Sequence, residues 1–165
     1  MDLAAFFAWL ENTAYSVGIR ESILLYPLIE TTHVITLTLF LGMIGLLDLR
    51  LTGLGLRSMP VSEVAERLLP WAWAGFVIMV ISGGLLFLLG PVRASENIFF
   101  QIKVVMIALA GINAGVFHVT IFQRVAEWDA DATPPARARM AGFASLVLWS
   151  GVVICGRMQA YNWFD

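Results

Sequence analysis

The segment that decides the fold runs from Leu24 to Arg50 and reads LLYPLIETTHVITLTLFLGMIGLLDLR. It is long and apolar enough to cross a bilayer, because a spanning helix needs about 20 mainly apolar residues. Its first half nevertheless carries two ionisable residues, Glu30 and His33, one helical turn apart. Ionisable groups are costly in hydrocarbon and usually mark function, so this pair is where we look for a site.

The composition of the whole chain agrees with a membrane protein. Of its 165 residues, 59% are hydrophobic and 13% are charged, whereas an average soluble domain has about 25% charged residues. The net charge is −2, so the chain has no basic surface for nucleic acid. Cys155 is the only cysteine, which excludes an internal disulfide and a thiolate metal cage; we interpret it as a buried packing residue.

Four apolar segments qualify as spans, so we predict an all-α, integral membrane four-helix bundle forming one domain over residues 1–165. The predicted spans are approximately 22–47, 71–89, 98–122 and 141–160. Between the first two, residues 61–69 alternate apolar and charged side chains at helical spacing, which predicts a short surface helix. GPVRASEN, residues 90–97, is expected to be a tight turn, and Pro134 and Pro135 are expected to end any helix there.

Glycines in two spans predict where the helices of the bundle pack closely. Gly111 and Gly115 form a G-x-x-x-G motif in the third span, and Gly42 and Gly45 lie in the first. Small residues let helix backbones approach each other in lipid. We therefore expect these four glycines to lie at contacts between helices of this chain.

The N-terminal stretch DLAAFFAWLENTAYSVGIRES, residues 2–22, lacks the pattern of a cleaved signal peptide. Its mixture of aromatic and polar residues predicts one amphipathic helix lying at the membrane interface. An even number of spans places both termini on one side. The two long loops and their flanks hold six arginines, against Arg20 and Arg93 on the other face; the six are Arg50, Arg57, Arg67, Arg124, Arg137 and Arg139. The positive-inside rule then predicts a multi-pass protein of the bacterial inner membrane with both termini in the periplasm.

Three charged residues fall at one predicted depth. Glu30, Lys103 and Arg157 each lie about 20 residues, or roughly 30 Å, from the arginine that marks the cytoplasmic end of their span. An acid and two bases at one level can neutralise each other in the membrane. We therefore expect these three side chains to converge in a buried ionic cluster near the periplasmic boundary.

His33 lies one turn deeper than Glu30, on the helical face that also holds Tyr26. Met106 lies at the level of His33 and shares a face with Lys103. These residues predict one pocket with a polar mouth and an apolar floor. The other histidine, His118, is displaced from His33 by about 11 residues, or roughly 16 Å, along the bundle. A single haem held by both histidines is therefore not expected.

Four stretches of the chain resemble a family of small bacterial four-helix membrane proteins of unknown function. They are HVITLTLFLGMIGLLDLRLTGLGL (33–56), PWAWAGF (70–76), FFQIKVVMIALAGINAGVFH (99–118) and LWSGVVICGRMQAYNWF (148–164). A more distant likeness is to the membrane protoporphyrinogen oxidase family and to the membrane domain of copper-resistance proteins. His33, Lys103 and His118 match their pattern of an early His followed by a later Lys and His. The oxidase likeness implies a haem b on His33.

The roles of the candidate residues stay open at this point. His33 is a structural histidine bonded to Glu30 or to another helix, an axial haem ligand, or a proton relay. Glu30 is a candidate to orient the ring, and Met106 is either the opposite iron ligand or core. Lys103 and Arg157 would pair with haem propionates or neutralise Glu30. His118 is a boundary histidine or part of a second cofactor site.

Three functions compete, and we assign no catalytic residue and leave open whether the protein is an enzyme. The first is a haem b protein for electron transfer or a haem-dependent redox reaction, with quinone or porphyrin as its partner. The second is a cofactor-free structural or accessory subunit of a larger membrane complex, as a homo- or hetero-oligomer. The third and weakest is a transporter, because the four spans show no internal duplication or broken helix.

Overall fold

The computed structural model describes residues 2–161, and their secondary structure is entirely helical. Four helical segments are long and apolar enough to cross a membrane. They are α3 (Leu25–Thr52), α4 (Val61–Phe87), α6 (Ile98–Val116) with its extension through a π-helical turn η1 (Phe117–Ile121) and a 3-10 helix η2 (Phe122–Glu127), and α7 (Ala136–Met158). The predicted all-α bundle of four membrane helices is confirmed.

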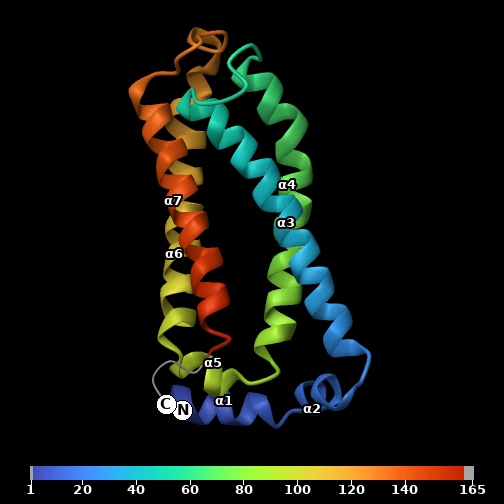
Figure 1. The fold of residues 1–165 in the computed structure, drawn as a ribbon. Helices are drawn as coiled ribbons and strands as arrows, with labels where there is room; N and C mark the ends of the chain where they lie inside the picture. Colours follow the sequence, from blue (N-terminus) through green and yellow to red (C-terminus); the bar gives the residue numbers. More distant parts are fainter. Residues whose placement is uncertain (1, 162–165) are drawn as a thin grey trace.

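The four helices form two antiparallel hairpins, α3 with α4 and α6 with α7. The hairpins contact each other through α3 and α7, whereas in the described chain α4 makes no extended contact with α6 or α7. They approach at one end and diverge toward the other (Figure 1). We call the first the loop end, because it carries the connections 53–60 and 128–135. The second, which carries α1, α2 and α5, is the terminal end.

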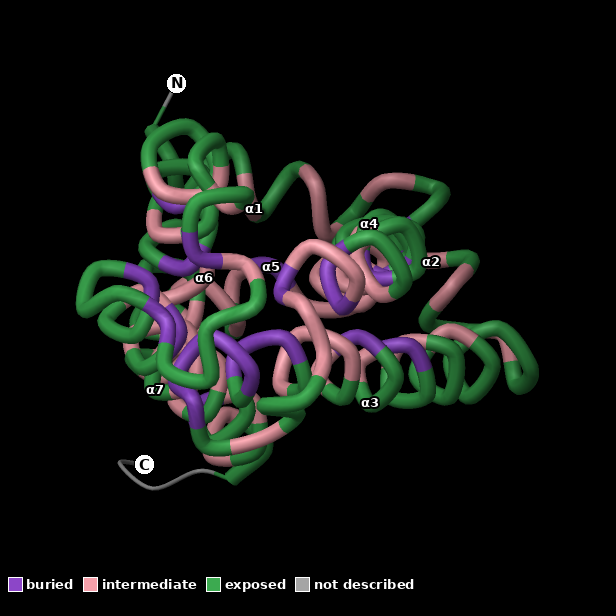
Figure 2. The backbone as a smooth tube through the Cα atoms, turned by 90° about the horizontal axis from the view of Figure 1, so that it is seen from above, coloured by how far each residue is buried: buried purple, intermediate pink, exposed green. Residues whose placement is uncertain are grey.

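The best-packed part of the molecule lies at the loop end. Most of the buried apolar residues gather there, and Figure 2, which looks down on this end, shows that the outward turns of the long helices are exposed. This core is made by eight apolar residues from both hairpins and the 128–135 loop: Leu47, Leu51, Val61, Val64, Ala65, Phe117, Trp128 and Ala138. Burial of this apolar surface holds together the ends of helices that separate further down.

Arg50 joins the two loops at this end. It is 0% exposed, and its Nε donates to the Met59 carbonyl at 2.6 Å. Its Nη2 donates to the carbonyls of Asp129 at 3.1 Å and Asp131 at 3.0 Å. The residue that the sequence suggested as a charged boundary marker is therefore a buried clasp between the two connections.

The predicted surface helix over residues 61–69 does not exist as a separate element; it is the first part of α4. Val61, Val64 and Ala65 point into the loop-end core, and Pro70 lies within the continuous helix. The prediction was wrong because the charged residues Glu63 and Arg67 indicated an exposed element. They pair with each other at 2.6 Å on the outer side of α4.

Asp129 caps the start of α4. Its carboxylate accepts hydrogen bonds from the Ser62 backbone N–H at 2.7 Å and the Ser62 hydroxyl at 2.5 Å. Burial raises the pKa of Asp129. The hydrogen bonds from Ser62 and from the Val61 amide, together with the charge of Arg50, lower it by more than that, so the pKa of Asp129 lies below the usual value. A loop residue from one hairpin thus secures the first turn of the other.

At the terminal end, three short helices lie across the open bundle (Figure 1). They are α1 (Leu3–Glu11), α2 (Ala14–Glu21) and α5 (Pro91–Glu96). The single interfacial helix that we expected is two, because the Thr13 side chain caps α2 by accepting from the Ser16 N–H at 3.3 Å. The expected tight turn is instead α5, which starts at Pro91, a residue suited to the first helical position.

The glycine prediction is wrong for all four positions. A Cβ atom placed on Gly42, Gly45, Gly111 or Gly115 would meet nothing within 4 Å. The close approach occurs elsewhere, at Gly142 of α7, where a Cβ would lie 3.1 Å from the Asp48 carbonyl oxygen. The motif spacing identified a small-residue face correctly, but that face does not meet another helix of this chain.

Candidate functional site

His33 lies on α3 and is held by α4. Its Nδ1 is 2.9 Å from the Ser82 hydroxyl, and that hydroxyl donates its hydrogen to the Ile78 carbonyl at 2.7 Å. Because a hydroxyl has one hydrogen to give, Ser82 acts as the acceptor toward His33.

The second carbonyl beside Ser82 agrees with this tautomer. The Met79 carbonyl oxygen lies 3.3 Å from the Ser82 hydroxyl, and a carbonyl can only accept a hydrogen bond. With the single hydroxyl hydrogen directed to these carbonyls, Nδ1 must carry the proton of the contact between His33 and Ser82. We assign Nε2 as the unprotonated nitrogen, with its lone pair available to a ligand.

Gly83 packs against the His33 ring, and we call Ser82 and Gly83 together the histidine seat. A Cβ atom at this position would lie 3.2 Å from Cε1 of His33, closer than ordinary van der Waals contact. The pair Ser82 and Gly83 thus provides one acceptor and one flat surface for the imidazole. Sequence analysis missed both residues, although a serine followed by two glycines within an apolar run was a usable signal.

Lys103 lies on the opposite hairpin. Its Nζ donates to Oε1 of Gln159 on α7 at 2.9 Å and lies 5.0 Å from the centroid of the Phe100 ring. It is near enough to His33 to act on it electrostatically. The two hairpins thus present an imidazole and an ammonium group to a common region. Gln159 is a further residue that sequence analysis missed.

The predicted ionic cluster of Glu30, Lys103 and Arg157 does not form. Glu30 is exposed, while Arg157 is exposed and donates to the Tyr161 hydroxyl at 2.9 Å. Within residues 2–161 the ion pairs are Arg20 with Glu11 at 3.6 Å and Arg67 with Glu63 at 2.6 Å. Equal depth was the wrong criterion, because it says nothing about where a side chain points around its helix axis.

Met106 lies in the interface between α6 and α7, where its thioether packs against Gly151. His118 lies in the π-helical turn, is exposed, and stacks on Phe122 with ring centroids 4.9 Å apart. Its neighbour Phe117 packs in the loop-end core with the start of α4, whereas His33 bonds near the end of α4. About 18 residues of α4 separate these levels, roughly 27 Å, so the two histidines belong to different ends, as the sequence predicted.

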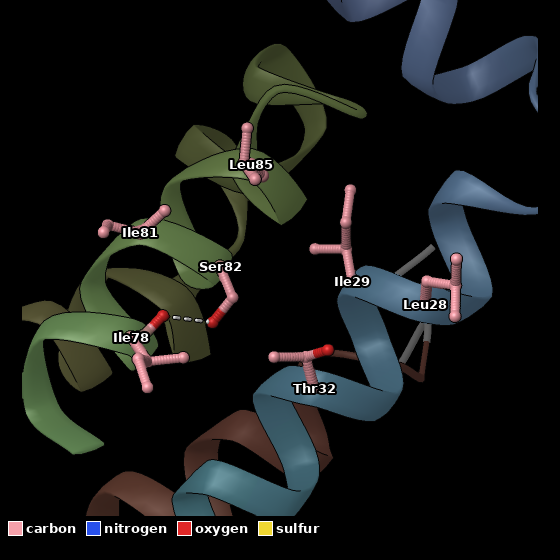
Figure 3. A pocket seen from close by; sticks show the side chains of 7 residues that line it. All are labelled: Leu28, Ile29, Thr32, Ile78, Ile81, Ser82 and Leu85. Atoms are coloured by element: carbon pink, nitrogen blue, oxygen red, sulfur yellow. Dashed lines mark hydrogen bonds between the residues drawn. The ribbon is translucent and has the colours of Figure 1, made fainter. Parts of the chain in front are cut away.

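The pocket that the sequence predicted around His33 stays a prediction, and two surface grooves lie near its residues. A groove of about 310 Å³ lies between α3 and α4 beside Ser82, and its walls are almost wholly aliphatic. Figure 3 shows Ser82 in its wall, bonded to Ile78. The other lining residues are Leu28, Ile29, Thr32, Ile81 and Leu85. A second groove of about 340 Å³ at the terminal end contains Tyr26 and Arg20.

Aromatic rings close the terminal end of the region between the hairpins. Phe87 of α4 stacks on Phe100 of α6 with centroids 5.4 Å apart, and Phe7 of α1 meets Phe87 edge-on at 5.7 Å. Lys103 lies directly above Phe100. Lys103 thus lies beside the aromatic contact that joins the two hairpins at the terminal end.

Comparisons with protein-family models, with curated proteins and with solved structures found no match to this chain. Among residues 2–161, no group of three or more His, Cys, Asp or Glu side chains gathers in a way that would hold a metal ion. The chemistry of the candidate site therefore has to be argued from one oriented imidazole and its surroundings.

Proposed function

We propose that this protein binds one haem b through Nε2 of His33 and uses it to transfer electrons within the membrane. The observation that carries the proposal is the fixed tautomer of His33. Metal-ligating histidines nearly always donate their other ring N–H to an oxygen acceptor, which orients the ring and raises its basicity. Ser82 supplies that arrangement.

The donor set fits haem better than a bare metal ion. A porphyrin contributes four nitrogen ligands of its own, so one imidazole is a sufficient axial ligand from the protein. Lys103 offers a cation for a haem propionate, and Gln159 positions it. Because Met106 packs against Gly151, we assign it to the core, and His33 would hold the iron. Haem would supply one-electron chemistry there.

The arginine distribution supports an orientation in the bacterial inner membrane, with the loop end in the cytoplasm and the terminal end in the periplasm. The haem would then lie in the periplasmic half, beside lipid. A partner that exchanges electrons from within the bilayer, such as a quinone, or a porphyrin substrate, suits this position.

The test uses the absorption spectrum of protein purified in detergent from cells supplied with haem. We expect a Soret band in the wild-type protein and its loss in His33→Ala. His118→Ala is the matched control, because the chain has two histidines and His118 lies at the other end. A colourless wild-type protein, or a Soret band of full intensity in His33→Ala, overturns the proposal.

A second candidate is a cofactor-free accessory subunit of a membrane complex. The observation that favours it is the small-residue face of Gly111 and Gly115, which contacts nothing in this chain and suits close packing against another membrane helix. Gly111→Leu would then release a co-purifying partner from solubilised membranes while leaving the isolated protein folded. Haem bound to the native protein would exclude a cofactor-free subunit.

A further inference from the structure

Asp48 is the acidic residue that the fold buries. It lies one turn before the end of α3 and is 5% exposed, whereas every other Asp or Glu among residues 2–161 is half-buried or exposed. Helix α7 covers it closely, because Gly142 brings the α7 backbone against the Asp48 backbone. The position is buried by protein, independently of any surrounding lipid.

The carboxyl group of Asp48 is incompletely satisfied. The Ser145 hydroxyl of α7 lies beside it, but Oδ2 is inaccessible and has no hydrogen-bond partner. On α6, the Asn113 amide is engaged elsewhere, because it donates to the Ala141 carbonyl at 3.0 Å. The environment thus provides one hydroxyl and no cation.

The charged groups of the surrounding elements are directed elsewhere. Arg50, two residues along α3, donates to loop carbonyls, and on α4 Arg67 pairs with Glu63. The remaining charged or titratable groups near the loop end are exposed, except Asp129, which is half-buried and accepts hydrogen bonds from Ser62. The exposed ones are Arg57, Glu66, His118, Arg124, Glu127, Asp131, Arg137 and Arg139. None of these groups forms an ion pair with Asp48 within residues 2–161.

We propose that Asp48 is a proton-binding site, a carboxyl group that carries a proton in the folded protein at neutral pH. A buried carboxylate without a cation is far more costly than the uptake of a proton from water. The step is a simple protonation, in which the carboxylate lone pair takes a proton and no other bond changes. The neutral acid also gains a donor for hydrogen bonding, which a carboxylate lacks.

The inference does not rest on the haem site, because His33 lies in the other half of the bundle. Since the unfolded chain would have Asp48 ionised at neutral pH, folding takes up one proton there. The stability of the wild-type protein should then fall as the pH rises. Asp48→Asn, which is neutral and of the same shape, should remove that dependence.

Infrared spectroscopy tests the assignment on the full chain in a maltoside detergent, which has no carbonyl group of its own. At pH 7 we expect a carbonyl stretching band of a protonated carboxylic acid that shifts in D₂O. Asp48→Asn should lose this band, whereas Asp131→Asn, which changes an exposed loop residue, should keep it. Ser145→Ala should shift the band, because it removes the hydroxyl that lies beside the Asp48 carboxyl.

Absence of the band in the wild-type protein at pH 7, or its persistence in Asp48→Asn, overturns the proposal. If Asp48→Asn does not fold, the wild-type protein still decides the question. Its band must disappear reversibly when the pH is raised, as the proton leaves. A band that is missing at neutral pH in folded wild-type protein contradicts the assignment whatever the variant does.

Discussion

The Ser82 hydroxyl lies 2.9 Å from Nδ1 of His33 and gives its own hydrogen to the Ile78 carbonyl. This relationship joins the two helices of one hairpin and fixes which ring nitrogen is free. Two predictions about the proposed haem site follow from it, one for each residue of the histidine seat.

Ser82→Ala removes the acceptor while leaving His33 in place. The ring then loses the acceptor that orients it, so we expect haem affinity to fall by about 10- to 100-fold, the usual effect of losing such a partner. Haem titration of the apoprotein, followed by absorbance, measures this change. Ser150→Ala, on the exposed side of α7, is the control and should bind haem like the wild type.

Gly83→Ala places a methyl group against the His33 ring, where the present distance from a Cβ to Cε1 is 3.2 Å. The ring has to move by a few tenths of an ångström, which should alter the Soret maximum and weaken haem binding. Gly84→Ala is a closely matched control, because a Cβ at Gly84 meets nothing within 4 Å. Equal effects of the two substitutions would mean that helix propensity, and not the histidine seat, is responsible.

The helices of this fold were predictable because hydrophobic length in a membrane protein is a strong signal. All four spans were found, although α4 starts about ten residues earlier than expected. The error at α4 arose because Val61, Val64 and Ala65 are buried against a loop more than sixty residues away along the chain. The helical spacing of residues 61–69 predicted a helix correctly, but it does not identify the distant loop that covers its apolar face.

The candidate site was only partly predictable. Depth along a helix can be counted from the sequence, and it separated His33 from His118 correctly. The direction of each side chain depends on how the hairpins cross. Counting residues along the helices therefore predicted, wrongly, that Glu30 and Arg157 lie beside Lys103. The hydrogen-bond partners of His33 and Lys103 are Ser82 and Gln159. Both partners are neutral, so pairing residues by opposite charge does not find them.

Arg50→Met tests whether the buried clasp at the loop end stabilises the fold. The substitution keeps much of the side-chain volume but leaves the carbonyls of Met59, Asp129 and Asp131 without their donor. Hydrogen bonds to charged groups are worth about 1.5–3 kcal/mol each, and a buried arginine is itself costly, so we expect a net loss of about 3 kcal/mol. Thermal unfolding in detergent measures it, with the exposed Arg137→Met expected to unfold like the wild type.

Asp129→Asn tests the cap that the 128–135 loop places on α4. Hydrogen bonds from Ser62 lower the pKa of Asp129, so its carboxylate stabilises the protein above the unfolded pKa of about 3.9, and this stability is lost as the pH falls through the lower folded value.

We therefore expect Asp129→Asn to cost about 1 kcal/mol at pH 7, the usual effect of losing a helix cap. It should also flatten the decline in unfolding temperature below pH 4. Asp131→Asn is the control, because its exposed side chain has no such cap, and it should keep the wild-type acid dependence. If the unfolding temperature of Asp129→Asn fell below pH 4 as steeply as that of the wild type, the two hairpins would be held at this end by Arg50 and the apolar core alone.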